Sequence, residues 1–176
     1  MNPPALHVAK YVTHRLATEQ EQTVRQIALA LKIPTQTAVD LAAPAMARLI
    51  DGPCWLVPVP TSGGSLTPNT QLARAIAKLV PGARVNLAIA RNHPVESSCQ
   101  RRRRGLAGLT IEDHAIIRTA GPMQPMALYF VDNVITTGHT IAACRRALGW
   151  GTGLAYADAS TRTNTQPIPQ LQMPLL

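Results

Sequence analysis

The sequence predicts an α/β fold, in which a parallel sheet is flanked by helices and preceded by a small helical module. After residue 52, short apolar runs alternate with stretches of helical spacing, which is the pattern of β-α-β units. Aromatic residues make up 3% of the chain, so aliphatic side chains fill the interior, as is usual for buried parallel strands. A chain of 176 residues suffices for one domain with an appendage.

Residues 1–52 are predicted to form the helical module. Apolar spacing favours helices over 6–16, 23–31 and 35–50, the last interrupted or kinked at Pro44. The second and third also resemble a helix-turn-helix, in which Thr35-Gln36-Thr37 would begin a recognition helix. We favour a structural or dimer-forming module over DNA binding, because residues 1–50 carry five basic and three acidic side chains, a net charge of only +2. The turn Asp51-Gly52-Pro53 is the expected boundary.

Residues 53–165 are predicted to hold the alternating strands and helices. We expect strands at 55–59, 84–89, 127–131 and 153–157, and helices at 66–80 and 140–148. Residues 91–110 lack a clear period and are expected to form a long loop, which in a compact domain is usually functional. The proline-rich end, residues 166–176, is expected to be an irregular tail.

The composition favours a globular protein with an anionic partner. The formal charge is +8, and 14 of the 17 basic residues are arginine, whose fork of donors fits phosphate. The three cysteines are widely spaced and form no C-x-x-C pair, which argues against a zinc site and for a reducing compartment. No secretory pattern and no long apolar run is visible. We therefore expect a cytoplasmic protein without a membrane segment.

The segment 131–140 carries the clearest chemistry. An apolar strand ends at Asp132, whose carboxylate can accept hydrogen bonds from two neighbouring ribose hydroxyls. The turn that follows, Thr136-Thr137-Gly138-His139-Thr140, offers consecutive backbone N–H groups, threonine hydroxyls and a glycine that permits close approach. The helix N-terminus behind it favours negative charge. These features predict a ribose 5-phosphate site. The alternative is a plain strand-turn-helix with Thr140 as N-cap.

This stretch resembles the ribose-phosphate signature of the type I phosphoribosyltransferase family. That signature is an apolar strand, two acids, two variable residues and then Thr-Thr-Gly-x-Thr. The chain matches it at Asp132, Thr136, Thr137, Gly138 and Thr140. It departs at Asn133, which replaces the second acid. The resemblance extends over roughly residues 53–162 and is nearest to the competence-associated branch. It implies a type I phosphoribosyltransferase-like sheet, with ligand contacts also from Asn133, Ile135 and His139.

Two further loops have counterparts in the family. Ser62-Gly63-Gly64 follows the first strand, where the family has its pyrophosphate loop, and such residues can wrap a pyrophosphate with backbone donors. A flexible connector is the alternative there. Residues 91–110 stand at the place of the family's mobile catalytic loop. In it, the run Arg101-Arg102-Arg103-Arg104 either closes over the site, with Arg101 or Arg102 on the leaving pyrophosphate, or forms a solvated or nucleic-acid-binding patch.

The activity that the resemblance implies is phosphoribosyl transfer from 5-phosphoribosyl-1-pyrophosphate (PRPP) to a nitrogen acceptor, with release of pyrophosphate. Mg²⁺ is the implied cofactor, held through the substrate with Asp132 as the one candidate contact from the protein. The unidentified acceptor would lie near Asp158-Ala159-Ser160-Thr161. A non-catalytic regulator that senses PRPP and a DNA-uptake accessory protein are the alternatives. A homodimer is expected.

Overall fold

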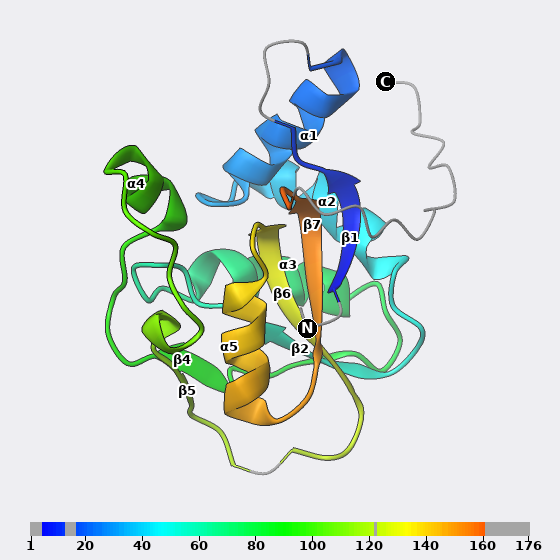
Figure 1. Cartoon of the computed structure of the whole chain (residues 1–176). Helices are drawn as coiled ribbons and strands as arrows, with labels where there is room; N and C mark the ends of the chain where they lie inside the picture. The colour runs from blue at the N-terminus through cyan, green and yellow to red at the C-terminus, as the bar shows by residue number, and fades with distance from the viewer. Residues whose placement is uncertain (1–4, 13–16, 122, 161–176) are drawn as a thin grey trace.

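The computed structural model describes residues 5–12, 17–121 and 123–160, and it shows an α/β architecture (Figure 1). The strands are β1 (Ala5–Lys10), β2 (Cys54–Pro58), β3 (Arg84–Val85), β4 (Ile89–Arg91), β5 (Ile116–Arg118), β6 (Ala127–Ile135) and β7 (Thr152–Asp158). The helices are α1 (Glu19–Ala30), α2 (Gln36–Ala47), α3 (Thr67–Ala77), α4 (Ser98–Arg103), the 3₁₀ helix η1 (Glu112–His114) and α5 (His139–Leu148). Five strands form one parallel sheet in the order β1-β7-β6-β2-β3, while β4 and β5 form a separate antiparallel pair.

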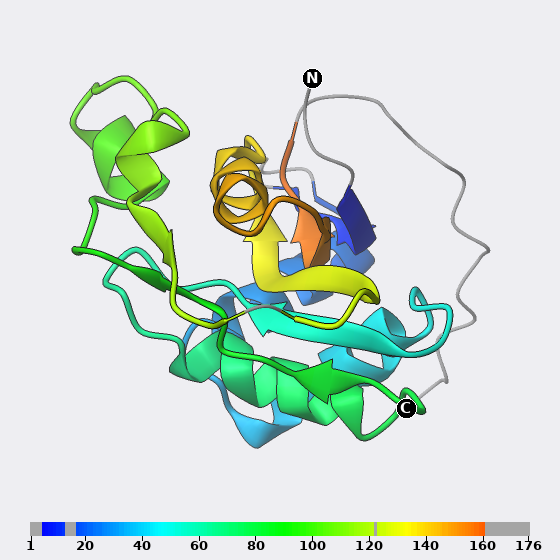
Figure 2. The same ribbon diagram turned by 90° about the horizontal axis from the view of Figure 1, so that it is seen from below.

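Helices cover both faces of the main sheet, as the view in Figure 2 shows. On one face, α1, α2 and α3 bury their apolar side chains in a core that contains Met46, Ile76 and Leu56. On the other face, α5 and the β4–β5 pair cover a second core, which contains Ile141 and Phe130. The predicted parallel sheet with flanking helices is therefore present.

The path of the chain changes sides between β2 and β6. From β2 it passes through α3 on one face to β3, and from β6 it passes through α5 on the opposite face to β7. The segments that leave the adjacent ends of β2 and β6 therefore diverge at the carboxyl edge of the sheet. In open α/β sheets, ligands bind at such a topological switch point.

Local signals explain where the main helices begin and end. Thr18 caps α1 in a capping box with Glu21, and the Thr35 side chain accepts a hydrogen bond from the third residue of α2. Helix α5 lies between two glycines in the left-handed conformation, Gly138 at φ 81° and Gly149 at φ 93°. Because a side chain is strained at such angles, these glycines fix both ends of α5.

The helix predicted over residues 6–16 is wrong at its start, where residues 5–10 form strand β1. Leu6 and Val8 both pack against the core, and Lys10 lies opposite Asp158 of β7. Short apolar spacing of this kind fits a helix or a strand. The strand is favoured here because the backbone N–H and C=O groups at the edge of β7 need hydrogen-bond partners, which residues 5–10 supply. Residues 13–16 lie outside the described residues.

The segment 1–52 is consequently not purely helical. α1 and α2 correspond to the other two predicted helices, although the second ends at Ala47. Val24, Ala28 and Val39 are buried in the core that also holds side chains of β2, α3 and β7. Ile33, which lies between α1 and α2, is 84% exposed and so does not pack between these helices.

Most elements predicted beyond residue 53 are present, with three differences. The strand expected over 84–89 is split, since β3 joins the main sheet and β4 pairs outside it. The strand expected over 127–131 continues to Ile135. Residues 91–110 are not a plain loop, because Ser97 begins α4 in a capping box with Gln100. The predicted tail, 166–176, lies outside the described residues.

Candidate functional site

Three segments border the switch point. The glycine loop, residues 61–65, follows β2, and the threonine turn, residues 136–140, follows β6. The arginine excursion, residues 92–115, connects β4 to β5 and projects beyond the carboxyl ends of the strands (Figure 1). Val95 N–H donates to the Ser62 carbonyl at 2.8 Å, and His139 Nδ1 lies 2.8 Å from the Leu109 carbonyl. The excursion therefore contacts both of the loops that the sequence predicts as ligand-binding.

Asp132 lies in β6, directly after Val131, the last residue of β6 that pairs with β2. Its Oδ1 accepts hydrogen bonds from the Asn133 backbone N–H at 2.8 Å and from Asn69 Nδ2 at 3.3 Å. Asn69 is buried near the start of α3 and also donates to the Val59 carbonyl at 2.7 Å. None of the described residues donates a hydrogen bond to Asp132 Oδ2. One carboxylate oxygen is thus fixed by the protein, and the second keeps its capacity to accept.

Opposing effects determine the pKa of the Asp132 carboxyl group. Burial raises its pKa to about 6, although the hydrogen bonds from Asn133 and Asn69 and the cations of Arg91 and Lys32 favour the ionised form. The carboxylate is therefore mostly ionised at neutral pH but pays a desolvation cost for it. Strongly perturbed carboxyl groups of this kind concentrate at functional sites.

The threonine turn begins α5 with a glycine and not with a threonine cap. Gly138 occupies the N-cap position, so Thr140 stands in the first turn of the helix and not at its cap. The first N–H groups of a helix have no partner within it, and the helix dipole favours an anion at this end. Thr137 Oγ1 accepts from the His139 N–H at 3.4 Å. The backbone donors predicted for a phosphate are therefore located at the carboxyl edge of β6.

The glycine loop is a tight turn between β2 and α3. Thr61 N–H donates to the Ser65 carbonyl at 2.8 Å, and Gly64 N–H donates to the Thr61 carbonyl at 2.9 Å. Gly64 has φ 90°, which a residue with a side chain rarely adopts. A Cβ atom at Gly63 or Gly64 would meet nothing within 4 Å, so this side of the loop is open to an incoming group.

Arg91 links this loop to the base of the excursion. Its Nε donates to the Thr61 carbonyl at 2.7 Å, and its Nη1 donates to the His114 carbonyl. Burial is the main effect that lowers the pKa of the guanidinium, and the charge of Asp132 opposes it. Since the pKa of an arginine is very high, Arg91 remains a cation beside the site.

His114 is the buried histidine of the excursion, with 5% of its surface exposed. Its Nδ1 lies 3.4 Å from Oγ1 of Thr140. Burial, followed by the charges of Arg91 and His139, lowers the pKa of His114 to about 4, so the ring is neutral at physiological pH. Nearby, Arg146 of α5 forms an ion pair with Glu112 of η1. The base of the excursion is thereby attached to the first turn of α5 through Thr140 and to its last turn through Arg146.

Two predicted ligand contacts are engaged within the protein. Asn133 Nδ2 donates to the Ala28 carbonyl at 3.0 Å, which ties β6 to α1. The Asp158 carboxylate accepts from Lys10 Nζ at 2.7 Å and from both the N–H and the hydroxyl of Ser160. Asp158 therefore joins the ends of β1 and β7, at the place where the acceptor was expected. Thr161 lies outside the described residues.

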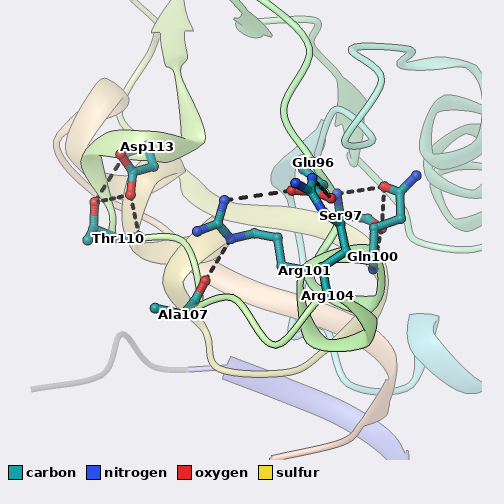
Figure 3. Close-up of polar contacts among 8 residues, drawn as sticks. All are labelled: Glu96, Ser97, Gln100, Arg101, Arg104, Ala107, Thr110 and Asp113. Carbon is teal, nitrogen blue, oxygen red and sulfur yellow. Dashed lines mark hydrogen bonds and ion pairs between the residues drawn. The ribbon is translucent and has the colours of Figure 1, made fainter.

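The predicted catalytic arginines differ in their surroundings (Figure 3). Arg101 Nε donates to the Ala107 carbonyl at 2.7 Å, and its Nη1 lies 3.8 Å from Glu96. Arg104 pairs with the same carboxylate at 2.9 Å. In the described part of the chain, the side chains of Arg102 and Arg103 are exposed and have no hydrogen-bond or ion-pair partner. The run thus contains two arginines that brace the excursion and two that are available to an anion.

The site holds few potential metal ligands of its own. Across residues 5–12, 17–121 and 123–160, no three His, Cys, Asp or Glu side chains converge as metal ligands. Asp132 Oδ2 is a hard oxygen of the kind that Mg²⁺ prefers, and this ion commonly binds through one or two carboxylates plus substrate phosphates. The residues present therefore fit a Mg²⁺ ion that is held mainly by a pyrophosphate.

Comparison of the chain with protein-family models, with curated proteins and with solved structures finds no match. Within the described residues, no helix combines the length and the apolar character needed to cross a membrane.

Sequence reasoning did not single out Asn69, Arg91 or His114. Each is an isolated residue of a common type, and each reaches the site from a different element. The only local signal was position, since Arg91 ends a strand and Asn69 begins a helix after the glycine loop.

Proposed function

We propose that this protein binds PRPP at the switch point and transfers its phosphoribosyl group to a nitrogen acceptor. In the reaction, the bond between C1 of the ribose and the pyrophosphate oxygen breaks, and pyrophosphate leaves with the electron pair. A C1–N bond forms, and the acceptor nitrogen loses its proton to solvent or to the leaving group. We also propose that residues 53–162 form a domain of the type I phosphoribosyltransferase kind, which their sequence resembles.

The observation that carries the proposal is the arrangement around Asp132. A carboxylate with one uncommitted oxygen lies between two loops that diverge from neighbouring parallel strands. The threonine turn supplies helix N-terminal donors on one side, and the open glycine loop supplies backbone on the other. PRPP has a phosphate at one end of its ribose and a pyrophosphate at the other. Its groups therefore match the order in which the site presents the threonine turn, the Asp132 carboxylate and the glycine loop.

In this proposal, each segment has a distinct task. Asp132 Oδ2 accepts from the ribose hydroxyls, the threonine turn holds the 5-phosphate, and the glycine loop with Ser62, Gly63 and Gly64 holds the pyrophosphate. When bound, Mg²⁺ neutralises charge on the leaving pyrophosphate. Arg102 of the excursion approaches the same group, and closure of the excursion excludes water, which would otherwise hydrolyse the sugar.

The test is a transfer assay with the whole chain. PRPP, Mg²⁺ and a panel of purine, pyrimidine and other nitrogen acceptors are mixed with the protein, and pyrophosphate release is measured. Release with one acceptor supports the enzyme. Calorimetric binding of PRPP without release from any acceptor supports a sensor, and absence of binding rejects the site.

A second candidate function is nucleic-acid binding, which the exposed Arg102 and Arg103 favour. Glu96 pairs with Arg101 and Arg104 and leaves Arg102 and Arg103 uncompensated, so the protruding tip carries excess positive charge. Contacts to phosphates would weaken steeply with added salt. Fluorescence titration of single- and double-stranded DNA across a salt series, with Arg102→Ala and Arg103→Ala, tests this candidate.

A further inference from the structure

Arg91 and His114 connect the two loops that flank Asp132. Arg91 donates to the Thr61 carbonyl of the glycine loop at 2.7 Å and to the His114 carbonyl in η1. The His114 ring in turn contacts Thr140 of the threonine turn, at 3.4 Å between Nδ1 and Oγ1. These contacts form one path from the glycine loop, through the base of the excursion, to the threonine turn.

The hydrogen bond between His114 Nδ1 and Thr140 Oγ1 can run in either direction, depending on which of the two atoms donates its proton. A threonine hydroxyl has a single proton and two acceptor sites, and a neutral imidazole has a single N–H. If Thr140 donates to His114, its proton is consumed within the protein. If His114 donates from Nδ1 to Thr140, the hydroxyl proton remains free for an acceptor outside. A phosphate in the threonine turn offers only acceptor oxygens, so the second arrangement is the one that lets Thr140 bind it.

We propose that His114 is a positioning residue, which donates from Nδ1 to Thr140 Oγ1 and so directs the Thr140 hydroxyl at the phosphate of the ligand. The inference rests on the proposed function, because it requires a phosphate in the threonine turn. It assigns a task to a buried side chain that touches no ligand. A second contact, the ion pair between Glu112 and Arg146, attaches η1 to the last turn of α5.

The test measures binding of ribose 5-phosphate by calorimetry at pH 8 for five forms of the full chain. These are the parent, His114→Asn, His114→Leu, Thr140→Val and the double variant His114→Leu/Thr140→Val. Asparagine places an amide donor where Nδ1 lies, so His114→Asn should bind like the parent. His114→Leu should bind roughly three- to tenfold more weakly, the effect of one hydrogen bond. The double variant should bind no more weakly than Thr140→Val, because both changes remove the same contact.

Three results distinguish the possible failures. If the parent does not bind ribose 5-phosphate, the proposed function is wrong and this inference falls with it. If the parent binds and His114→Leu binds equally well, the inference alone is overturned. Additive losses in the double variant also overturn it, because they indicate a general structural effect of the leucine. Should His114→Leu fail to fold, His114→Gln replaces it, since its amide extends one carbon further and misses Thr140.

Discussion

Asp132 is a carboxyl group whose position suits a ligand better than it suits folding. Burial raises its pKa to about 6, so above that pH the folded protein holds a partly desolvated charge. Asp132→Asn keeps the shape and removes the charge. We expect this variant to lose binding of PRPP, because the amide is a poorer partner for ribose hydroxyls. Its thermal midpoint at pH 8 should be at least that of the parent. Calorimetry and thermal unfolding measure the two effects. A variant that binds normally would mean that the site is wrongly assigned.

Gly138 and Gly149 allow a matched test of the threonine turn. Both have left-handed backbone angles, and they lie at opposite ends of α5. Replacing either with alanine should cost roughly 1 kcal/mol of unfolding free energy, because the strain is the same. Only Gly138→Ala should also weaken ribose 5-phosphate binding, since its methyl group would lie in the turn that is proposed to hold the phosphate. Urea unfolding and calorimetry check this. Equal binding by the two variants would contradict a phosphate site at the turn.

At the scale of residues, the sequence alone predicts those candidate site residues that are neighbours along the chain. Asp132 and the threonine turn belong to one stretch of the chain, and their spacing alone gives them a chemical meaning. Asn69 and Arg91 belong to other elements and acquire meaning only when the sheet brings β2, α3 and β4 to the same edge. The engagement of Asn133 with α1 was equally invisible, because its partner is a backbone carbonyl 105 residues away.

The excursion is an element with a fixed base and a separate tip. Its base is attached to α5 and Arg91, and its tip is held by the contacts of Glu96 with Arg101 and Arg104 (Figure 3). Ligand binding should order this segment, as expected from its length and its charge. Sequence reasoning found the segment but missed α4, because a six-residue helix shows too little periodicity.

The two kinds of arginine in the tip should respond differently to substitution. Arg101→Ala removes contacts to Glu96 and Ala107, so amide hydrogen exchange across 96–107 should become faster. Arg102→Ala removes an exposed charge, so exchange should not change, while turnover falls at least about tenfold with little effect on ribose 5-phosphate binding. Arg74→Ala, at an exposed arginine of α3, is the control. Equal effects of Arg102→Ala on turnover and on binding would indicate a structural role.

At the scale of the whole molecule, β1, α1 and α2 show that the N-terminal segment contributes to the sheet and its core. Met46 and Leu31 are almost completely buried beside residues of β2, α3 and β7. The parallel sheet was predictable beyond residue 53 because its strands are short apolar runs between turns. The place of β1 was not, because which edge accepts a strand depends on the assembled sheet. The strand expected over 84–89 divides for a similar reason, because whether each part pairs with β2 or with β5 depends on the assembled fold.

Asp132 and His114 have opposite pKa shifts, so their contributions to the stability of the protein should oppose each other between pH 4 and 6. For Asp132 the pKa rises from 3.8 to about 6 on folding, so its contribution to stability is complete below about pH 3.8 and is lost as the pH rises through 6. For His114 the pKa falls from 6.5 to about 4, so its contribution is present above pH 6.5 and is lost as the pH falls through 4. Each shift corresponds to about 3 kcal/mol, with opposite dependence on pH.

Single substitutions should therefore reveal the contribution that each of the two groups conceals in the parent. Relative to the parent, Asp132→Asn should lose about 3 kcal/mol of unfolding free energy between pH 6.5 and pH 4, because the His114 contribution is no longer offset. His114→Asn should gain a similar amount over the same range, and the double variant should follow the parent. Urea unfolding at pH 4, 5, 6.5 and 8 measures these differences, with His93→Asn, at an exposed histidine, as the control. If both single variants run parallel to the parent, neither group is held in the protonation state that its burial implies.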